Sequence, residues 1–524
     1  MKRFLRFVAS TIVAFLHFSS AARAGSPNQS PDTQSEPRTA ENNVVASPNT
    51  KMDSFQDIIS DAAADPIDSS VAPAYEDPNY GPKRAVLGLE AQGYMYSPQT
   101  QQEEILPSIW GKFKDSGDIM GAQGHISFQA LAILPPAGSG FYYEAPEAYI
   151  GAPIANSAVR VDVGRKLEHW NLLDERWQLG IWQPRFLWDY IHPEEVGLTG
   201  VFLSAEGSGV RFVVFGSPLF VPERGVPINI ENGQLTSQSP FFVSPPSNVQ
   251  VLGVPTTVDY QLNVPSISSI ILHPSAGYLL HVGENTGPWI QGAQSFSPMN
   301  QLITAYSPSL VTTSNTSSVE IPVYPRVMSH YLTSVDMGYQ VGIFSATLSS
   351  LWDVPIQQTI ASNLVSESVI PSLAISPSVD LRFHIPNWGM VHTYLSFLGQ
   401  WGGNAPDVAG PTAVQDITAN AGDERYPYQR AYMIGGESGV PGASYLGAWA
   451  DHVAISARLL YDITHRGTIL SADVRFQPLA RWQINFGADL LGSTEELAAG
   501  QSPVDLIGRY KANDDFRGGL SYAF

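Results

Sequence analysis

The stretch ARWQINFGADL, residues Ala480–Leu490, alternates strictly between two kinds of side chain. One face carries Trp482, Ile484, Phe486, Ala488 and Leu490. Polar residues and glycine fill the other face. Because successive side chains of a strand point to opposite sides, the stretch predicts a β-strand with one apolar face. Its length of about 10 residues is what a tilted strand needs to cross a bilayer.

The same alternation recurs along the chain from Arg84 onward. Residues His452–Asp462 and Thr468–Phe476 repeat it directly upstream, and short turns separate the three segments. Less regular examples are Leu87–Gln92, His125–Ala132, Val159–Gly164 and Val335–Ile343. These segments predict an all-β antiparallel fold, although alternation alone fits a soluble sandwich as well as a barrel.

Composition excludes several classes of protein. The 524 residues include no cysteine, which excludes disulfide scaffolds, thiolate metal sites and cysteine nucleophiles. A formal charge of −20 argues against nucleic-acid binding. Charged residues make up 15% of the chain, well below the ~25% of ordinary soluble proteins. Beyond the first residues the sequence holds no apolar run long enough for a membrane helix, so a membrane-spanning fold would be a barrel.

The start of the chain predicts export. Lys2, Arg3 and Arg6 precede a short apolar run, and Ala22–Ala24 fits a small-x-small cleavage site. We therefore expect a signal peptide over residues 1–24. Residues 25–83 are rich in Pro, Ser and Asn and poor in aromatics, which predicts a disordered periplasmic extension or, alternatively, a plug in a barrel lumen. Residues 84–524 would form the barrel.

The last stretch, LIGRYKANDDFRGGLSYAF (Leu506–Phe524), ends inside an alternating strand. Aromatic or apolar residues at alternate positions before a final Phe resemble the closing strand of Gram-negative outer-membrane β-barrels, porins in particular. The resemblance implies a place in the cell outer membrane, in contact with outer-membrane lipid and lipopolysaccharide. It also implies that the barrel-assembly machinery recognises Tyr522 and Phe524.

A second motif, EAYIGAPIANSAVRVDVGRK (Glu147–Lys166), is similar to an early porin hairpin in which a Glu-Ala-Tyr strand precedes a Val-Gly-Arg strand. The following block places four tryptophans within residues 170–188 and matches no family pattern. Tyr and Trp near predicted strand ends, such as Tyr142, Tyr149 and Trp482, are typical of a membrane–water interface.

These patterns predict a transmembrane antiparallel barrel of about 14 strands, within a range of about 12 to 18, with long extracellular loops. The long loops are expected over Pro222–Pro265, Glu284–Pro325 and Gly402–Gly447. A further strand is expected near Tyr426–Gly435 or within Val249–Leu262, because the other predicted strands do not bring both termini of the barrel to the periplasmic side. So wide a lumen is either an open pore or is narrowed by an inward loop or by the N-terminal extension.

Charged residues on the polar faces are the candidate pore-lining residues. They are Arg160, Asp162, Arg458, Asp473, Arg475, Arg481, Asp489 and Arg517. The groups near the two ends of the chain could meet where the barrel closes. Mixed rows of Arg and Asp would create a transverse field that selects small polar solutes. The alternative is that they are wall salt bridges that only stiffen the barrel.

The sequence contains no G-x-S-x-G, H-E-x-x-H, P-loop or calcium-loop motif, so no catalytic residue, metal site or cofactor is predicted. The leading hypothesis is a porin-like channel for passive diffusion of small polar solutes. The alternatives are a plugged outer-membrane barrel with a structural, adhesive or surface-binding role and a secreted soluble binder. Acidic loop residues such as Glu194 and Glu195 could bind cations that bridge lipopolysaccharide or serve only solubility. A homo-oligomer is compatible with the sequence, which marks no contact face.

Overall fold

A computed structural model describes residues 84–95, 105–119, 122–134, 140–154, 158–226, 228–237, 239–242, 244–284, 286–312, 317–356, 364–366, 369–385, 389–403, 425–440, 453–479, 481–494 and 505–524. The predicted signal peptide (1–24) and N-terminal extension (25–83) lie outside these residues. Within the described ranges, no helix combines the length and apolarity needed to cross a membrane.

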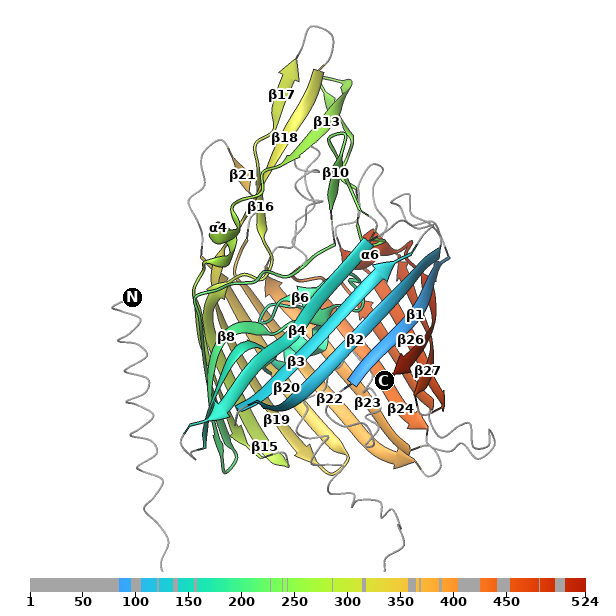
Figure 1. Ribbon diagram of the computed structural model, residues 1–524. Helices are drawn as coiled ribbons and strands as arrows, with labels where there is room; N and C mark the ends of the chain where they lie inside the picture. The colour runs from blue at the N-terminus through green and yellow to red at the C-terminus, as the bar shows by residue number, and fades with distance from the viewer. Residues whose placement is uncertain are drawn as a thin grey trace, which may run out of the picture. The chain divides into compact units, whose positions relative to one another are not determined.

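Eighteen strands form one closed antiparallel barrel in which each strand pairs with the next along the chain (Figure 1). They are β1 (Arg84–Tyr94), β2 (Ile105–Ile119), β3 (Ala122–Ile133), β4 (Gly140–Pro153), β5 (Val159–Lys166), β8 (Leu198–Gly207), β9 (Val210–Ser217), β14 (Ser275–Gly283), β15 (Gly287–Pro298), β19 (Ser329–Val341), β20 (Phe344–Pro355), β22 (Ser372–Ile385), β23 (Gly389–Gly402), β24 (Arg430–Val440), β25 (Val453–Asp462), β26 (Gly467–Leu479), β27 (Trp482–Ser493) and β28 (Asp515–Ala523). The all-β barrel is confirmed, but the expected number of about 14 strands is wrong.

The barrel closes through its last strand. In β28, Tyr522 pairs with Leu87 of β1, and the backbone N–H of Phe524 donates to the carbonyl oxygen of Ala85 at 2.9 Å. This closure leaves no free strand edge in the barrel sheet, which is the condition for a sheet to cross a membrane.

The outer surface of the barrel is apolar. Leu89, Phe486 and Phe524 are 54%, 59% and 61% exposed, whereas Asp489, on the opposite face of the same strand as Phe486, is fully buried. Outward positions of the other strands carry similar side chains. A soluble protein does not expose so continuous an apolar surface, and the hydrocarbon of a bilayer would cover it.

Two of the strands beyond the expected number lie in predicted loops. β24 lies within the predicted loop Gly402–Gly447, near the expected hidden strand at Tyr426–Gly435. β15 lies inside the predicted loop Glu284–Pro325, so that prediction is wrong. Its alternation is hard to see because Gly292 and Gln294 share the outward face with Ile290.

The hairpin predicted over Glu147–Lys166 is confirmed as β4 and β5, with Tyr149 opposite Gly164. Gly164 has a φ of +133°, and a Cβ there would collide with the carbonyl oxygen of Ala148 and with Tyr149. Tyr149 stacks on His125 at 5.3 Å. It therefore lies on the lumen face rather than at a membrane interface, as does Tyr142, which stacks on Trp188 at 4.5 Å.

The connections at the two ends of the barrel differ in length. At one end only two or three residues separate β2 from β3, β8 from β9 and β22 from β23, and at the other end most strands lie further apart along the chain. The long end faces the exterior in barrels of this type. It carries a six-stranded sheet of β12 (Asn248–Val251), β13 (Val254–Leu262), β16 (Ile303–Tyr306), β17 (Ser309–Thr312), β18 (Ser317–Arg326) and β21 (Val365–Ser366), together with the hairpin β10 (Asn229–Glu231) and β11 (Gln234–Thr236) and the helix α4 (Ile267–Ile271).

This outer sheet has a core of its own. Val258, Tyr260, Tyr306 and Ile321 pack together, and β13 pairs parallel to β18 (Figure 1). The strand expected within Val249–Leu262 therefore exists, but it belongs to the outer sheet and not to the barrel.

Candidate functional site: an internal segment in the lumen

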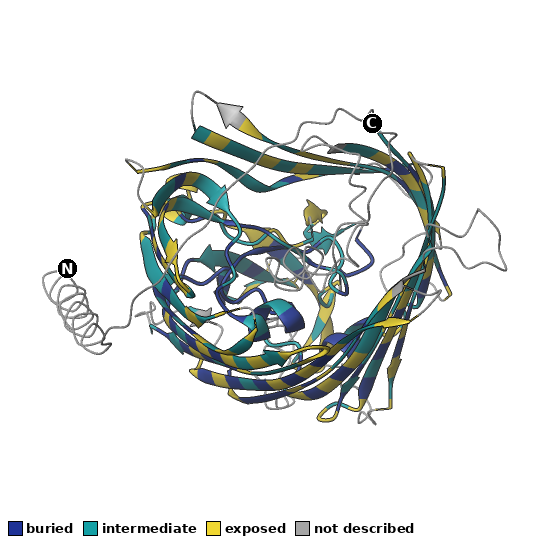
Figure 2. Cartoon of the chain, turned by 90° about the horizontal axis from the view of Figure 1, so that it is seen from below, coloured by how far each residue is buried: buried dark blue, intermediate teal, exposed yellow. Residues whose placement is uncertain are grey.

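The connection between β5 and β8, residues 167–197, folds into the barrel (Figure 2). We call it the internal segment. It contains α3 (Leu172–Trp177), β6 (Arg185–Phe186) and β7 (Glu194–Glu195). Trp170 and Trp182 stack at 5.3 Å and are at least 96% buried. The Trp-rich block that matched no family pattern is thus a packing element of the lumen.

The internal segment packs against a wide arc of the barrel wall. Its tryptophans share an apolar cluster with Leu279 of β14, Leu332 of β19 and Leu351 of β20, all at most 1% exposed. Tyr428, which precedes β24, and Tyr510 of α6 (Leu506–Tyr510) belong to the same cluster. Burying this much apolar surface is the main force that holds the segment inside.

A carboxylate of the wall fixes the start of α3. Asn171 caps the helix by accepting from the backbone N–H of Asp174 at 3.0 Å. The amide of Asn171 donates to Asp336 Oδ1 at 2.7 Å, and the backbone N–H of Leu172 donates to Asp336 Oδ2 at 3.2 Å. Asp336 lies on β19, so a capped helix terminus is joined directly to the barrel.

The last turn of α3 is attached to the neighbouring strands. Arg176 Nη2 lies 3.0 Å from both carboxylate oxygens of Asp380 on β22. Its guanidinium also lies 5.5 Å from the ring centre of Tyr394 on β23. Trp177 Nε1 donates to Ser376 Oγ at 3.0 Å. Both ends of this six-residue helix are therefore held by polar bonds to the wall.

Asp174 shapes the chain just after α3. Its carboxylate accepts the backbone N–H groups of Ile181 at 2.9 Å and of Trp182 at 2.8 Å. Burial raises the pKa of this carboxyl to about 6, although these two donors and Arg185 act in the opposite direction. Burial therefore favours the protonated, neutral form of this carboxyl.

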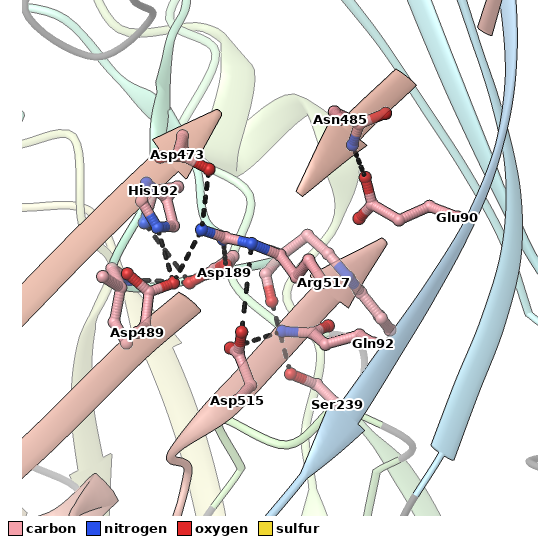
Figure 3. Close-up of polar contacts among 12 residues, drawn as sticks. Glu90, Gln92, Asp189, His192, Ser239, Asp473, Asn485, Asp489, Asp515 and Arg517 are labelled. Carbon is pink, nitrogen blue, oxygen red and sulfur yellow. Dashed lines mark hydrogen bonds and ion pairs between the residues drawn. The ribbon is translucent and has the colours of Figure 1, made fainter. Parts of the chain in front are cut away.

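The far end of the internal segment reaches a charged group that we call the Arg517 cluster: Arg517, Asp189, His192, Asp473, Asp489 and Asp515 (Figure 3). Arg517 Nη2 lies 2.9 Å from Asp489 and 3.4 Å from Asp473, and its Nη1 lies 3.9 Å from Asp189. His192 Nε2 lies 2.8 Å from Asp489 Oδ2. Asp189 and His192 belong to the internal segment and the others to the wall, so the cluster joins the two.

Three of the predicted pore-lining residues, Asp473, Asp489 and Arg517, meet in this cluster. Arg458 contacts the internal segment instead, where its Nη2 donates to the carbonyl oxygen of Ile191 at 3.2 Å. Arg475 lies on β26 opposite Asn485. Arg481 lies in the turn before β27, where its Nη1 is 3.4 Å from the Tyr522 hydroxyl.

Arg160 and Asp162 form a separate group on β5. Arg160 Nε lies 2.6 Å from Asp162 Oδ1, and Lys166 Nζ lies 2.7 Å from Asp162 Oδ2. Strands β1 to β4 stand between this group and β28, and no bond among the described residues joins it to the Arg517 cluster. Within each group the charged side chains form ion pairs. That these residues select solutes therefore stays a proposal.

Sequence reasoning missed Asp336, Asp380 and Asp189 as parts of the site. Asp336 and Asp380 stand on the polar faces of their strands, as many other polar residues do, and only the fold shows that they bind the internal segment. The Trp-rich block could have indicated that this connection folds inward, because so much aromatic surface needs to be buried. Glu194, expected in an outer loop, instead lies on the internal segment, 2.7 Å from Lys112 Nζ of β2.

Comparison with known proteins gives structural likeness only. No protein-family model and no curated protein matches the sequence. Among solved structures, OccK10 (OpdN) of Pseudomonas aeruginosa is 10% identical over 85% of this chain and 99% of its own, with a TM-score of 0.38. OccAB1 of Acinetobacter baumannii is 8% identical over 84% and 96%, at 0.43. OmpF of Salmonella typhi, in complex with daunomycin, is 10% identical over 84% and 97%, at 0.33.

At TM-scores below 0.5, these likenesses say nothing about what this chain carries. The chain's own geometry defines the class: a closed β-barrel with an apolar exterior, a charged inner wall and an internal segment. Its fold is that of a porin-like β-barrel.

Proposed function

We propose that this protein is an outer-membrane channel for passive diffusion of small polar solutes, narrowed by the internal segment. The observation that carries the proposal is the exposure of charged side chains inside the barrel. Lys112 and Asp473 stand on the inner face, each in the middle of its strand, yet they keep 51% and 33% of their side-chain surface exposed.

The lumen is not filled evenly. Where the internal segment packs on the wall, leucines such as Leu279 and Leu332 are buried. At the middle of β2 and β26, water reaches the charged side chains of Lys112 and Asp473. A water-filled passage lined by charge suits small polar solutes and excludes apolar ones, because leaving water for an apolar wall is costly for a polar molecule.

Conductance across a planar lipid bilayer tests the proposal. The purified protein should give discrete, ohmic current steps in potassium chloride, and the Asp473→Lys variant should shift the reversal potential in a salt gradient toward anions. Insertion into the bilayer without any current at any voltage would refute the channel.

A second function has its own observation. The outer sheet and α4 expose apolar side chains: Leu252, at the tip of the β12–β13 turn, is fully exposed, and Ile267 on α4 is 74% exposed. A surface-binding or adhesive role would use this sheet. A variant without residues 248–262 should keep its conductance if the sheet serves binding alone.

A further inference from the structure

One stretch of the connection between β9 and β14 is apolar, uncharged and exposed. Residues 260–283 include no Asp, Glu, Lys or Arg. The helix α4 lies in this stretch, and none of the described residues 263–274 around it is buried. Val264, Ile267 and Leu272 are 67%, 74% and 62% exposed. These side chains are not packed in the apolar cluster of the lumen or in the core of the outer sheet. Their contact with water is unfavourable.

The helix α4 stands at the rim of the barrel, at the base of the outer sheet (Figure 1). The backbone N–H of Phe220, three residues beyond the end of β9 at Ser217, donates to the carbonyl oxygen of Ile271 at 2.8 Å. The next strand, β14, begins at Ser275, four residues beyond Ile271. The helix is therefore joined directly to the outer ends of the paired strands β9 and β14.

The outward face of these two strands differs from that of its neighbours near the outer rim. There β15, β19 and β23 carry Phe296, Tyr331 and Trp401. The residue of β14 that pairs with Phe296 is Ala276, and its partner on β9 is Gly216. Aromatic side chains near strand ends hold a barrel at the boundary between membrane and water. Where β9 and β14 carry only glycine and alanine, α4 supplies the apolar surface.

We propose that α4 and its flanking residues lie in the bilayer, at the boundary between the headgroups and the acyl chains of the outer leaflet, and there replace the aromatic belt of β9 and β14. The partner is membrane lipid because the surface continues the apolar outer face of these strands, on which Val214 and Val282 are 37% and 41% exposed. Short apolar helical segments are stable at this depth when their side chains leave water for the acyl boundary.

The inference concerns a contact with lipid and not the passage of solutes. It rests on the proposed function only for the place of the barrel in a membrane. Because α4 follows β13 in the chain, its contact with lipid also fixes the base of the outer sheet at the membrane surface.

Spin labelling of the full-length chain in phosphatidylcholine vesicles tests the contact. The chain has no cysteine, so Ile267→Cys provides a single thiol for a nitroxide, the α4 label. Collision of the label is measured with oxygen, which concentrates in lipid, and with a water-soluble nickel chelate present on both sides of the membrane. We expect the α4 label to collide preferentially with oxygen.

Two further variants calibrate the measurement. Val254→Cys gives an outer-sheet label at a position on β13 that is 62% exposed, and this label should collide preferentially with the nickel chelate. Phe486→Cys gives a wall label on the outer face of β27, which should collide preferentially with oxygen. All three residues are exposed, so the cysteines leave the packed cores intact, and the gel shift on heating confirms folding.

Two outcomes overturn the inference. An α4 label as accessible to the nickel chelate as the outer-sheet label would place α4 in water. An α4 label shielded from both reagents would mean that protein, such as a second copy of the chain, covers the helix. The wall label separates these failures from a failure of the barrel. Oxygen preference of the wall label alone rejects only the lipid contact of α4, whereas nickel preference of all three labels rejects the membrane-spanning barrel.

Discussion

At Arg517 one guanidinium faces the carboxylates of Asp473, Asp489 and Asp515 on the wall and Asp189 on the internal segment. Its side chain is 12% exposed, so water screens these charges little. Arg517→Gln would leave the carboxylates facing one another with His192 as the remaining basic partner. We expect the free energy of unfolding to fall by about 3–5 kcal/mol. The loss of the heat-resistant folded band in gels, followed against temperature, measures it.

Arg430→Gln, at an exposed position at the start of β24, is the control, and its free energy of unfolding should change by less than about 0.5 kcal/mol. An Arg517→Gln protein as heat-resistant as this control would contradict the role given to the cluster. It would show that packing of the tryptophans alone holds the segment.

Asp174 predicts a dependence of stability on pH. Its pKa in the fold is about 6, above the ordinary value of about 3.9 for an unfolded chain. The folded protein therefore holds the proton more tightly. This stabilisation is full below about pH 4 and is lost as the pH rises through about 6, an effect of about 3 kcal/mol.

Urea unfolding of the wild type and of Asp174→Asn at about pH 4 and about pH 7 measures this effect. The amide cannot ionise and its oxygen can still accept a backbone N–H. The variant should thus lose less stability between the two pH values than the wild type. Equal losses in both proteins would show that Asp174 is not the titrating group.

At the scale of elements, the strands were readable from the sequence and the internal segment was not. Alternation located β25, β26 and β27 to within a few residues because one face of each contacts lipid and the other a polar lumen. Residues 167–197 carry no such period. Their fold depends on anchors from β19, β22 and β27 that are distant in sequence, so only the assembled barrel defines it.

The internal segment should limit the current. Replacing residues 172–193 by a short Gly/Ser linker should raise single-channel conductance several-fold, because the wall of an 18-stranded barrel cannot fill its own lumen. A gel shift on heating confirms that the variant still folds. Deletion of residues 25–83 is the companion experiment: an open pore keeps its conductance, whereas a barrel plugged by those residues gains it. Unchanged current after loss of residues 172–193 would place the constriction elsewhere.

At the scale of the whole molecule, the class of fold could be predicted but its size could not. The closing strand predicted that the sheet would seal on itself, and the pairing of β28 with β1 confirms it. The count fell short in part because β15 exposes Gly292 and Gln294 to the outside. The pattern of β12 and β13 misleads in the other direction, because these strands alternate like barrel strands but belong to the outer sheet. A period of two identifies a strand but not the sheet that it joins.

The barrel as a whole is stable only if its outer face meets hydrocarbon. Phe486 points outward from the middle of β27 and is 59% exposed. Phe486→Lys should therefore lower the free energy of unfolding in lipid vesicles by about 2–4 kcal/mol, the cost of a Lys near the bilayer midplane. The fraction folded, followed by gel shift against urea concentration, measures this. Ile230→Lys is the matched control, because Ile230 is 42% exposed on β10, outside the barrel sheet, and should fold as the wild type does. Equal stability of the two lysine variants in lipid would mean that this surface of β27 meets water, and the membrane-spanning barrel would be refuted.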